Sequence, residues 1–446
     1  MQIRRFLKGD SRTIKARKNI FFSIAIKGVD SLVYLLLVPV TLGYLNSYEY
    51  GIWLTLNSIL MWINSFDIGL GNGLRNKLAI AMANNDKKLA QIYVSTTFFM
   101  LIAIMGMLML IGSICSPFID WYNILNTTAE NVAHISEIVF VSFAIFCFNF
   151  IFKFVGNVYL ALQFPAINNL MVTLGHLLSL IIIFILTKTT QGSLFWVAVV
   201  YSTSPLIAYL ISYPITFYKI YPFLAPSYRL FKTQYLKDLF NIGVQFFLLQ
   251  LAGLILFALS NLLISHMFGP ESVTPYNIAY RYFSIILMLM NIVISPMWSA
   301  TTDAYERGDI DWIKRNMKSI HKVLYIAFLS LIFMVVISKW VYLLWVGKSV
   351  HIPILLSTLM AIYVMVLIFS LSYSNFINGL GKLTLQTINT VSVAILFIPI
   401  CYVLGNLYGL YGIIIGMIFL NLSGAVLNYI QFNKLINKKA DGIWNK

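Results

Sequence analysis

Charged residues are scarce in this chain. Asp, Glu, Lys and Arg make up only 10% of its 446 residues, whereas 60% are hydrophobic. Soluble domains carry about 25% charged residues. The scarcity excludes a separate soluble domain of ordinary size. A mean hydropathy of +0.83 is instead typical of a chain that lies mostly within a membrane.

Cysteine is rare as well. Cys115, Cys147 and Cys401 are scattered in or beside apolar segments, so they provide neither a disulfide framework nor the spacing of a metal site. Short catalytic motifs are missing too: there is no Gly-x-x-x-x-Gly-Lys-Ser/Thr phosphate loop, no His-Glu-x-x-His and no Cys-x-x-Cys. We therefore expect no metal, no resident cofactor and no enzymatic activity.

Long apolar runs fill most of the chain. A helix needs about 17–25 apolar residues to cross a bilayer, and twelve runs meet or approach this length. The sequence therefore predicts an all-α polytopic membrane protein. The expected spans are 20–43, 50–70, 93–114, 135–152, 167–187, 194–217, 239–264, 276–299, 323–345, 353–376, 387–404 and 410–432.

Lys and Arg are distributed unevenly around these spans. With the N-terminus inside, 26 of the 31 cations lie on the inside, 3 lie at the outside and 2 lie within spans. Cytoplasmic loops of membrane proteins carry such an excess, so both termini are expected to be cytoplasmic. Topology and anionic inner-leaflet lipid then account for the net charge of +16 without any nucleic-acid binding.

Two loops half a chain apart indicate an internal repeat. Segments 81–89 and 304–312 each place an Asp five residues after an Ala, at an offset of 223 residues. Six spans precede the midpoint, so both halves start inside and the axis that relates them runs along the membrane normal. The expected parts are a basic arm (1–19), a six-helix lobe (20–217), a cytoplasmic linker (218–238), a second six-helix lobe (239–432) and a basic tail (433–446).

Polar stripes run along two of the expected membrane helices. A charge at the centre of a membrane helix costs about 2.5–3.5 kcal/mol on insertion scales, so each stripe is expected to face water or a compensating charge. Asp30 lies one turn from Lys27, which leaves an internal ion pair and a substrate or ion site equally open. The stripes consist of Ser23, Lys27, Asp30, Ser31, Tyr34 and Thr41, and of Asn277, Arg281, Ser284, Asn291, Ser295 and Ser299.

Other polar groups lie within or near the spans. Asn57 and Asn64 share a face of the second helix, and Gln250 and Asn261 share a face of the seventh. Such amides line a polar path or hold helices together, and for any single amide the second role is favoured. 

Titratable groups in or near the spans also have either a functional or a structural interpretation. Asp67 and Arg75 mark the cytoplasmic entrance near the inner end of the second helix, where snorkelling or capping also explains Asp67. His176 lies inside a span, and a hydrogen-bonded packing role is favoured over a proton relay.

A motif in the first third of the chain points to a family. Gly43–Trp53 (GYLNSYEYGIW) followed by Phe66–Asn76 (FDIGLGNGLRN) resembles the bacterial O-antigen and capsule flippases of the Wzx type. These belong to the multidrug/oligosaccharidyl-lipid/polysaccharide (MOP) exporter superfamily, whose fold is MATE-like. The twelve-span layout and the half-chain repeat extend the resemblance over the whole chain.

The resemblance implies a function and a site. Flippases of this kind move undecaprenyl-pyrophosphate-linked oligosaccharide across the bacterial inner membrane by alternating access between two lobes. Similar flippases carry cavity-facing basic residues in helices one, two and eight; Lys27 matches the first and Arg281 the eighth, whereas Arg75 lies at or beyond the inner end of helix two. We expect Lys27 and Arg281 to hold the pyrophosphate. The remaining expected cavity residues are Asp30, Tyr34, Asn57, Asn64, Asn277, Ser284, Asn291 and Gln250.

The energy source and two rival functions stay open. Na⁺, H⁺ or the membrane potential could drive transport, with Asp30 as a candidate ion site. We expect a monomer that works beside a polysaccharide polymerase. An ion-coupled small-molecule exporter is the alternative, and it predicts an acidic cavity. A membrane glycosyltransferase would need long outer loops, and only 115–134 exceeds about ten residues by a clear margin.

Overall fold

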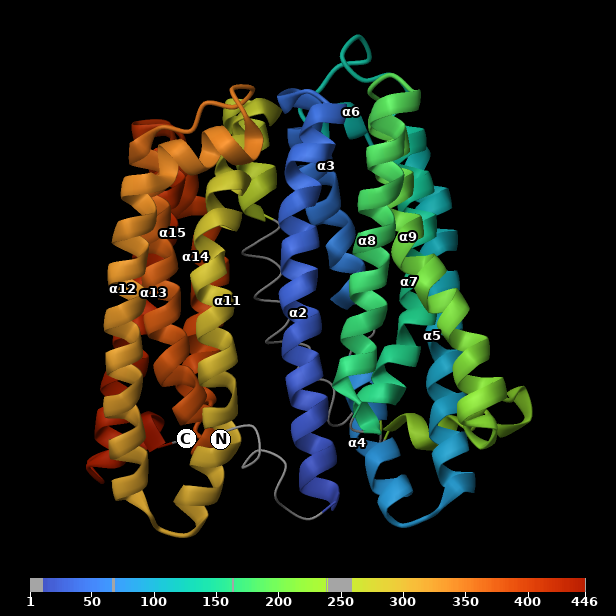
Figure 1. The fold of residues 1–446 in the computed structure, drawn as a ribbon, viewed down its shortest axis with the longest axis vertical. Helices are drawn as coiled ribbons and strands as arrows, with labels where there is room; N and C mark the ends of the chain where they lie inside the picture. The colour runs from blue at the N-terminus through green and yellow to red at the C-terminus, as the bar shows by residue number, and fades with distance from the viewer. Residues whose placement is uncertain (1–10, 66–68, 163, 238, 240–258, 446) are drawn as a thin grey trace. The chain divides into compact units, whose positions relative to one another are not determined.

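The computed structural model describes residues 11–65, 69–162, 164–237, 239 and 259–445 (Figure 1). These residues form helices joined by turns, and none of them lies in a strand. The chain divides into two compact units, residues 1–254 (unit 1) and 255–446 (unit 2), each of which is considered by itself below. The expected lobe boundaries and the orientation of the termini stay predictions.

Unit 1 is built around long helices that pack lengthwise. Within it α2 lies against α8, α7 and α8 lie against α9, and α5 lies against α4 and α7 (Figure 1). The elements are α2 (Ser11–Tyr44), α3 (Ser47–Leu60), η1 (Met61–Ser65), α4 (Leu70–Ala83), α5 (Lys87–Cys115), η2 (Ser116–Phe118), α6 (Trp121–Ile124), α7 (Ile135–Ala161), α8 (Pro165–Thr189), α9 (Leu194–Pro214) and the π-helical turn η3 (Ile215–Ile220).

Unit 2 is a second helical bundle. Its helix α15 packs against α13 and α14, and α11 packs against α12 and α13. The elements are a short apolar helix (Leu259–Phe268), α11 (Pro270–Glu306), α12 (Ile310–Val346), α13 (Ile354–Gly379), α14 (Thr384–Tyr408), α15 (Leu410–Ile436) and η7 (Gly442–Asn445).

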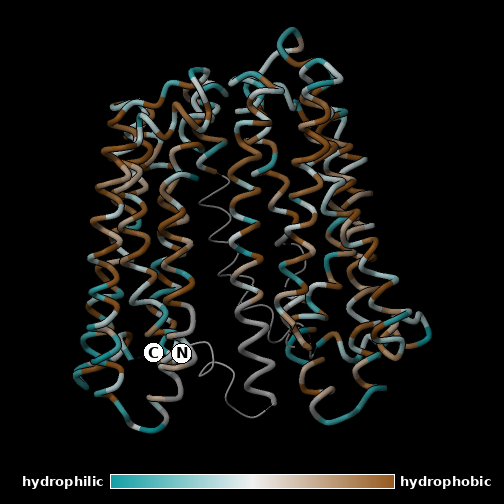
Figure 2. The backbone as a smooth tube through the Cα atoms, viewed as in Figure 1, coloured by the Kyte–Doolittle hydropathy of each residue, from teal (hydrophilic) through white to brown (hydrophobic). Residues whose placement is uncertain are grey.

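The prediction of an all-α polytopic membrane protein is confirmed. Ten helices in the described part of the chain are long and apolar enough to cross a membrane. Apolar residues dominate along the helices, and hydrophilic residues gather at many of the turns (Figure 2). The expected span over 239–264 lies mostly outside the described residues.

The expected continuous helix over 50–70 is wrong. Helix α3 ends at Leu60 and passes into the 3₁₀ turn η1, and α4 begins only after Gly69. Gly69 has φ +81°, a left-handed conformation that glycine adopts at little cost. Close packing adds a second constraint, because a Cβ atom on Gly73 would collide with the backbone carbonyl of Leu239. Backbone geometry therefore breaks a run that hydrophobicity alone presents as one helix.

The two repeated loops have the same structure. Asp86 and Asp309 each cap a helix, accepting hydrogen bonds at 2.9 Å from the backbone N–H of Leu89 and Trp312 respectively. The residues before them, Asn85 and Gly308, have φ +56° and +73°. Each Asp N–H also donates to the Ala carbonyl five residues earlier, at 2.9 Å and 2.8 Å. This is the Schellman arrangement that closes a helix, and it appears at equivalent places 223 residues apart.

The segment expected as a linker is pinned to α5. Gln91 Nε2 donates to the carbonyl of Ala225 at 2.9 Å, and the backbone N–H of Ser227 donates to Ser95 Oγ at 3.0 Å. Three short turns in the segment, at 222–224, 228–230 and 233–235, contact the same helix. The described part of this segment therefore packs as an integral layer of unit 1.

Candidate functional site

A parallel seam joins α2 and α8 in unit 1. Three polar contacts cross it, and the two residues in each contact are 146 positions apart. A constant separation means that the helices run parallel and in register. The contacts recur at multiples of seven residues, the repeat of two helical turns. They are Asn169 Nδ2 to Ser23 Oγ (2.6 Å), His176 Nδ1 to Asp30 Oδ1 (2.8 Å) and Tyr44 Oη to Thr190 Oγ1 (2.8 Å).

An apolar pair completes the same register. Leu37 and Ile183 are also 146 residues apart, and both are fully buried. The seam therefore alternates polar contacts with hydrophobic packing along the helices.

The Asp30–His176 pair is the chemical centre of the seam. His176 Nδ1 and Asp30 Oδ1 form a hydrogen bond at 2.8 Å, in which an ionised carboxylate would accept from the imidazole Nδ1–H. Both side chains are 26% exposed. The ring of Tyr34 lies against the imidazole, with 5.5 Å between ring centroids. The pair is accordingly held on two sides while retaining some access from outside the protein.

This geometry tests one of the two alternatives for Asp30, the ion pair with Lys27. The carboxylate is paired with His176, and within the described residues no carboxylate pairs with Lys27. Lys27 is exposed on α2. The Lys27–Asp30 ion pair that the spacing allows is therefore not formed, and the hydrogen bond expected of His176 is present.

The rest of the α2 stripe is mostly engaged inside unit 1. Thr41 is buried and hydrogen-bonded to Tyr201 Oη at 2.9 Å. Ser31 Oγ donates to the carbonyl of Lys27 in its own helix at 2.9 Å. The expectation that the stripe as a whole lines a wet path needs correction, because most of its members build the seam and its immediate surroundings. Lys27 is the stripe member that is exposed.

The α11 stripe in unit 2 divides along its length. Asn277 is 3% exposed, and its Nδ2 donates to Asn261 Oδ1 at 2.8 Å and to the Val273 carbonyl at 2.9 Å. Asn261 is thereby shown to join two helices, and Asn277, expected as a substrate contact, is instead buried as its partner. Arg281 and Ser284 are half-buried.

Farther along α11, the described member of the stripe is exposed. Asn291 is exposed, and its side chain donates to the carbonyl of Leu287 in the same helix at 3.0 Å. The side chains of Ser295 and Ser299 lie outside the described residues.

The other expected site residues are dispersed. Asn57 is half-buried on α3, and Arg75 is exposed on α4. Asp67, Gln250 and the side chain of Asn64 lie outside the described residues. The described residues contain no group of three or more His, Cys, Asp or Glu side chains that could hold a metal ion.

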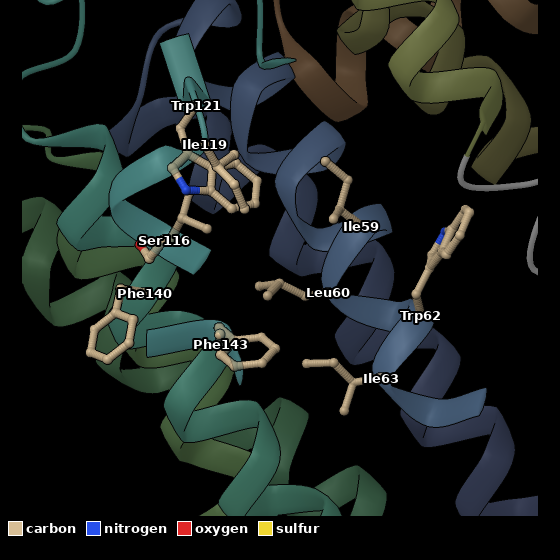
Figure 3. A pocket seen from close by; sticks show the side chains of 11 residues that line it. Ile59, Leu60, Trp62, Ile63, Ser116, Ile119, Trp121, Phe140 and Phe143 are labelled. Carbon is tan, nitrogen blue, oxygen red and sulfur yellow. The ribbon is translucent and has the colours of Figure 1, made fainter. Parts of the chain in front are cut away.

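Unit 1 also contains apolar cavities. One of about 250 Å³ lies between α3–η1 and the α5–α7 region (Figure 3). Leu60 and Ile63 face Phe143 across it, whereas Trp62 points away. A larger hollow of about 610 Å³ lies along α7, α8 and α9 and is lined chiefly by Leu and Ile. Such linings suit hydrocarbon chains and offer no cation to a phosphate.

Sequence reasoning missed His176 as the partner of Asp30. One signal was present: α2 carries Ser, Asp, Leu and Tyr at positions 23, 30, 37 and 44, and α8 with its C-cap carries Asn, His, Ile and Thr at 169, 176, 183 and 190. Polar and apolar residues that recur every seven positions in the same order on two helices are typical of a parallel helix pair. Nothing in the chain, however, says which two of its many helices are partners.

Known proteins resemble the chain in sequence and in fold. The model of the family described as "Polysaccharide biosynthesis protein" matches residues 16–301, more than half of the chain. A protein of Yersinia pseudotuberculosis described as a candidate O-antigen export protein is 22% identical over 402 residues, which cover 85% of this chain and 87% of the relative.

Solved structures show the same fold. An inward-facing multidrug resistance MATE family transporter of the MOP superfamily has a TM-score of 0.77 at 17% identity, covering 94% of this chain and 98% of that one. An outward-facing MATE transporter has a TM-score of 0.65 at 18% identity, with 98% of both chains covered. The chain is thus a multi-pass membrane protein with a MATE transporter fold, and it belongs to the polysaccharide biosynthesis protein family.

Proposed function

We propose that this protein is a flippase that carries undecaprenyl-pyrophosphate-linked oligosaccharide, an O-antigen or capsule repeat unit, across the bacterial inner membrane by alternating access. The family match, the MATE transporter fold and the O-antigen relative support transport of a polysaccharide precursor. We propose further that it works as a monomer beside a polysaccharide polymerase.

The exposed position of Lys27 on a membrane-spanning helix is the observation that carries this proposal. An ammonium group in a membrane span is costly unless water or an anion compensates it. Lys27 lies in the first turn of the span Ala25–Tyr44, where a neighbouring carboxylate would normally offset that cost. Asp30 is paired with His176 instead. Lys27 thus keeps its positive charge for an anionic ligand, and a lipid diphosphate is an anion that enters such a site from the membrane.

Arg281 is proposed as the second phosphate ligand. It is half-buried on α11 of unit 2, and the Oγ of Ser284 donates to its backbone carbonyl at 2.9 Å. A guanidinium group offers five N–H donors in a planar fork and so binds phosphate with defined geometry. The small-molecule exporter is less well supported, because the membrane carboxylate that would attract a cationic drug is already engaged.

A complementation assay tests the proposal. The chain is expressed in a bacterium that lacks its O-antigen flippase and contains the native glycan pathway, and surface glycan is scored. We expect the parent to restore glycan and Lys27→Ala or Arg281→Ala to lose it, with Lys27→Arg retaining part. Lys153→Ala is the matched control, because Lys153 is also an exposed lysine on a membrane-spanning helix.

Other outcomes would point elsewhere. If normally inserted Lys27→Ala and Arg281→Ala restore glycan as well as the parent, the phosphate-site assignment is wrong. If the parent never restores glycan and instead confers drug resistance, the exporter replaces the flippase.

Proton exchange at Asp30 and His176 is proposed as the energy source. A bound proton converts the pair into an imidazolium–carboxylate ion pair, and its loss leaves one negative charge beside Lys27 and Tyr34. Proteoliposomes under an imposed pH gradient test this idea: Asp30→Asn and His176→Gln should remove the dependence of flipping on the gradient. Dependence on a sodium gradient, or on membrane potential alone, would overturn it.

A further inference from the structure

A polar cavity lies at one end of unit 1, away from the Asp30–His176 pair. Three segments meet there: the first turn of α3, residues 131–138 at the start of α7, and the turn between α8 and α9. Its volume is about 450 Å³, within the range of about 300–1,000 Å³ that is usual for small-molecule sites. We call it the loop cavity and define it by Glu49, Asn131, His134, Glu137 and Phe195.

The walls of the loop cavity are fixed by local hydrogen bonds. Asn46 caps α3, because its Oδ1 accepts from the backbone N–H of Glu49 at 2.8 Å. The Oη of Tyr48 donates to Thr127 Oγ1 at 2.9 Å, which ties the 127–134 segment to α3. A Cβ atom on Gly192 would collide with the carbonyl of Tyr44, so the α8–α9 turn is pressed against the end of α2. These contacts preorganise the cavity.

The chemistry of the lining matches a sugar. Two carboxylates, Glu49 and Glu137, accept hydrogen bonds from hydroxyl groups, and the amide of Asn131 both donates and accepts. The ring of Phe195 offers an apolar face to the C–H surface of a pyranose. His134 Nδ1 lies 3.3 Å from Glu137 Oε1 in an exposed contact. A sugar carries closely spaced hydroxyls and apolar C–H faces, so it can use both kinds of group at once.

The charge of the cavity disfavours the diphosphate. Its titratable groups are two glutamates and one histidine, which repel a phosphate and tolerate a neutral or positively charged ligand. Fourteen residues of α2 separate Asp30 from Tyr44, which is about 21 Å along a helix. The loop cavity and the cationic Lys27 region are therefore distinct in place and opposite in charge.

We propose that the loop cavity is a saccharide-binding site for a neutral or amino sugar of the carried glycan. The binding of sugar follows from the cavity itself, and only the source of the sugar rests on the proposed function. The positive-charge bias places this end of unit 1 on the outside, where the glycan emerges. The cavity would then hold sugars of the glycan after they leave the membrane interior.

Saturation-transfer NMR on the full chain in nanodiscs tests the site. The probes are galactose, N-acetylglucosamine and glucuronate, each free in solution at millimolar concentration. We expect saturation transfer to the two neutral sugars and only background transfer to glucuronate. Glu137→Gln and Phe195→Ala should reduce the neutral-sugar signal at least fivefold. Glu130→Gln, an exposed carboxylate of the same connection outside the cavity, should leave it unchanged.

Clear results would overturn the proposal. These results are the absence of any neutral-sugar signal, a signal in Glu137→Gln equal to that of the parent, or a loss in Glu130→Gln equal to that in Glu137→Gln. Glu137→Gln changes one exposed group without changing its shape, so it keeps the test valid if Phe195→Ala fails to fold.

The assay separates this site from the proposed function. A chain that binds sugar in a Glu137-dependent way but never restores surface glycan keeps the cavity and removes the flippase. A chain that restores surface glycan but shows no Glu137-dependent sugar signal supports the flippase and overturns the saccharide site.

Discussion

His176 Nδ1 lies 2.8 Å from Asp30 Oδ1 across the seam between α2 and α8. The acid of a membrane helix is thus compensated by the neighbouring helix and not by Lys27, which is one turn away on its own helix. The pairing leaves Lys27 without a carboxylate partner among the described residues, which is the arrangement that the proposed phosphate site requires.

A double-mutant cycle should detect this pairing. Asp30→Ala and His176→Ala each leave a half-buried polar partner, so each is expected to destabilise the protein. In membrane proteins, hydrogen-bonded pairs measured this way average about 0.6 kcal/mol and reach about 1.7 kcal/mol. We expect a favourable coupling energy in this range for Asp30 and His176, measured by detergent-driven unfolding of the two single variants and the double variant.

The same cycle on Lys27 and Asp30 provides the control. The structure predicts a coupling energy near zero for that pair. A Lys27–Asp30 coupling energy larger than that of Asp30 and His176 would show that the carboxylate compensates Lys27 after all.

Close packing of α8 on α9 leads to a second prediction. A Cβ atom on Gly175 would lie 2.8 Å from Pro205 Cα, whereas a Cβ on Gly28 would meet nothing within 4 Å. Gly175→Ala should destabilise the protein by about 1–3 kcal/mol, as overpacking does. Gly28→Ala should be neutral or stabilise by up to about 1 kcal/mol, because alanine favours the helix. Unfolding curves that shift in the same direction for both variants would contradict this.

Hydrophobicity was enough to predict most of the membrane helices of this chain. Ten of the described helices are long and apolar enough to cross a membrane, because long apolar runs have few alternatives in a bilayer. The equivalence of the loops at Asp86 and Asp309 was also visible, because Asp is a favoured helix N-cap and both loops place it five residues after an Ala. The separate start of α4 was not visible, since it involves a left-handed glycine, Gly69, and close contact of Gly73 with Leu239.

The surroundings of the candidate site residues were harder to predict from the sequence. A polar stripe indicates that a helix face does not contact lipid. It does not indicate whether water, substrate or another helix covers that face. For Ser23, Asp30 and Thr41 the cover is a neighbouring helix, and for Asn277 it is Asn261. The loop cavity was also hidden, because its walls come from three segments between residues 49 and 195 that no local pattern connects.

The repeated loops offer a third prediction. Asn85 and Gly308 occupy the same left-handed position in the two turns. Alanine is strained there by about 1–2 kcal/mol, so Asn85→Ala and Gly308→Ala should each destabilise the protein, whereas Asn85→Gly should not. Asn84, whose φ of −85° is ordinary, provides the control variant Asn84→Ala. Equal unfolding midpoints for Asn84→Ala and Asn85→Ala would contradict the shared turn.

A pH-dependent stability difference is expected at Glu49, which lies in the first turn of α3 and outside the ten spans. Burial raises the pKa of its carboxyl group, and a hydrogen bond with the backbone of Asn46 offsets part of the rise. The folded state therefore binds this proton more tightly than the unfolded state does. Its contribution to stability is present below the ordinary carboxyl pKa and is lost as the pH rises through the raised value.

Glu49→Gln should consequently melt at a higher temperature than the parent at pH 7, and the difference should shrink toward zero near pH 4, where both side chains are neutral. Thermal unfolding of the two proteins over this pH range measures the effect. Glu130→Gln, at an exposed position, should follow the parent at both ends of the range. If Glu49→Gln instead melts lower than the parent at pH 7 and converges with it at pH 4, the ionised carboxylate stabilises the cap of α3, and burial is not the dominant effect at this residue.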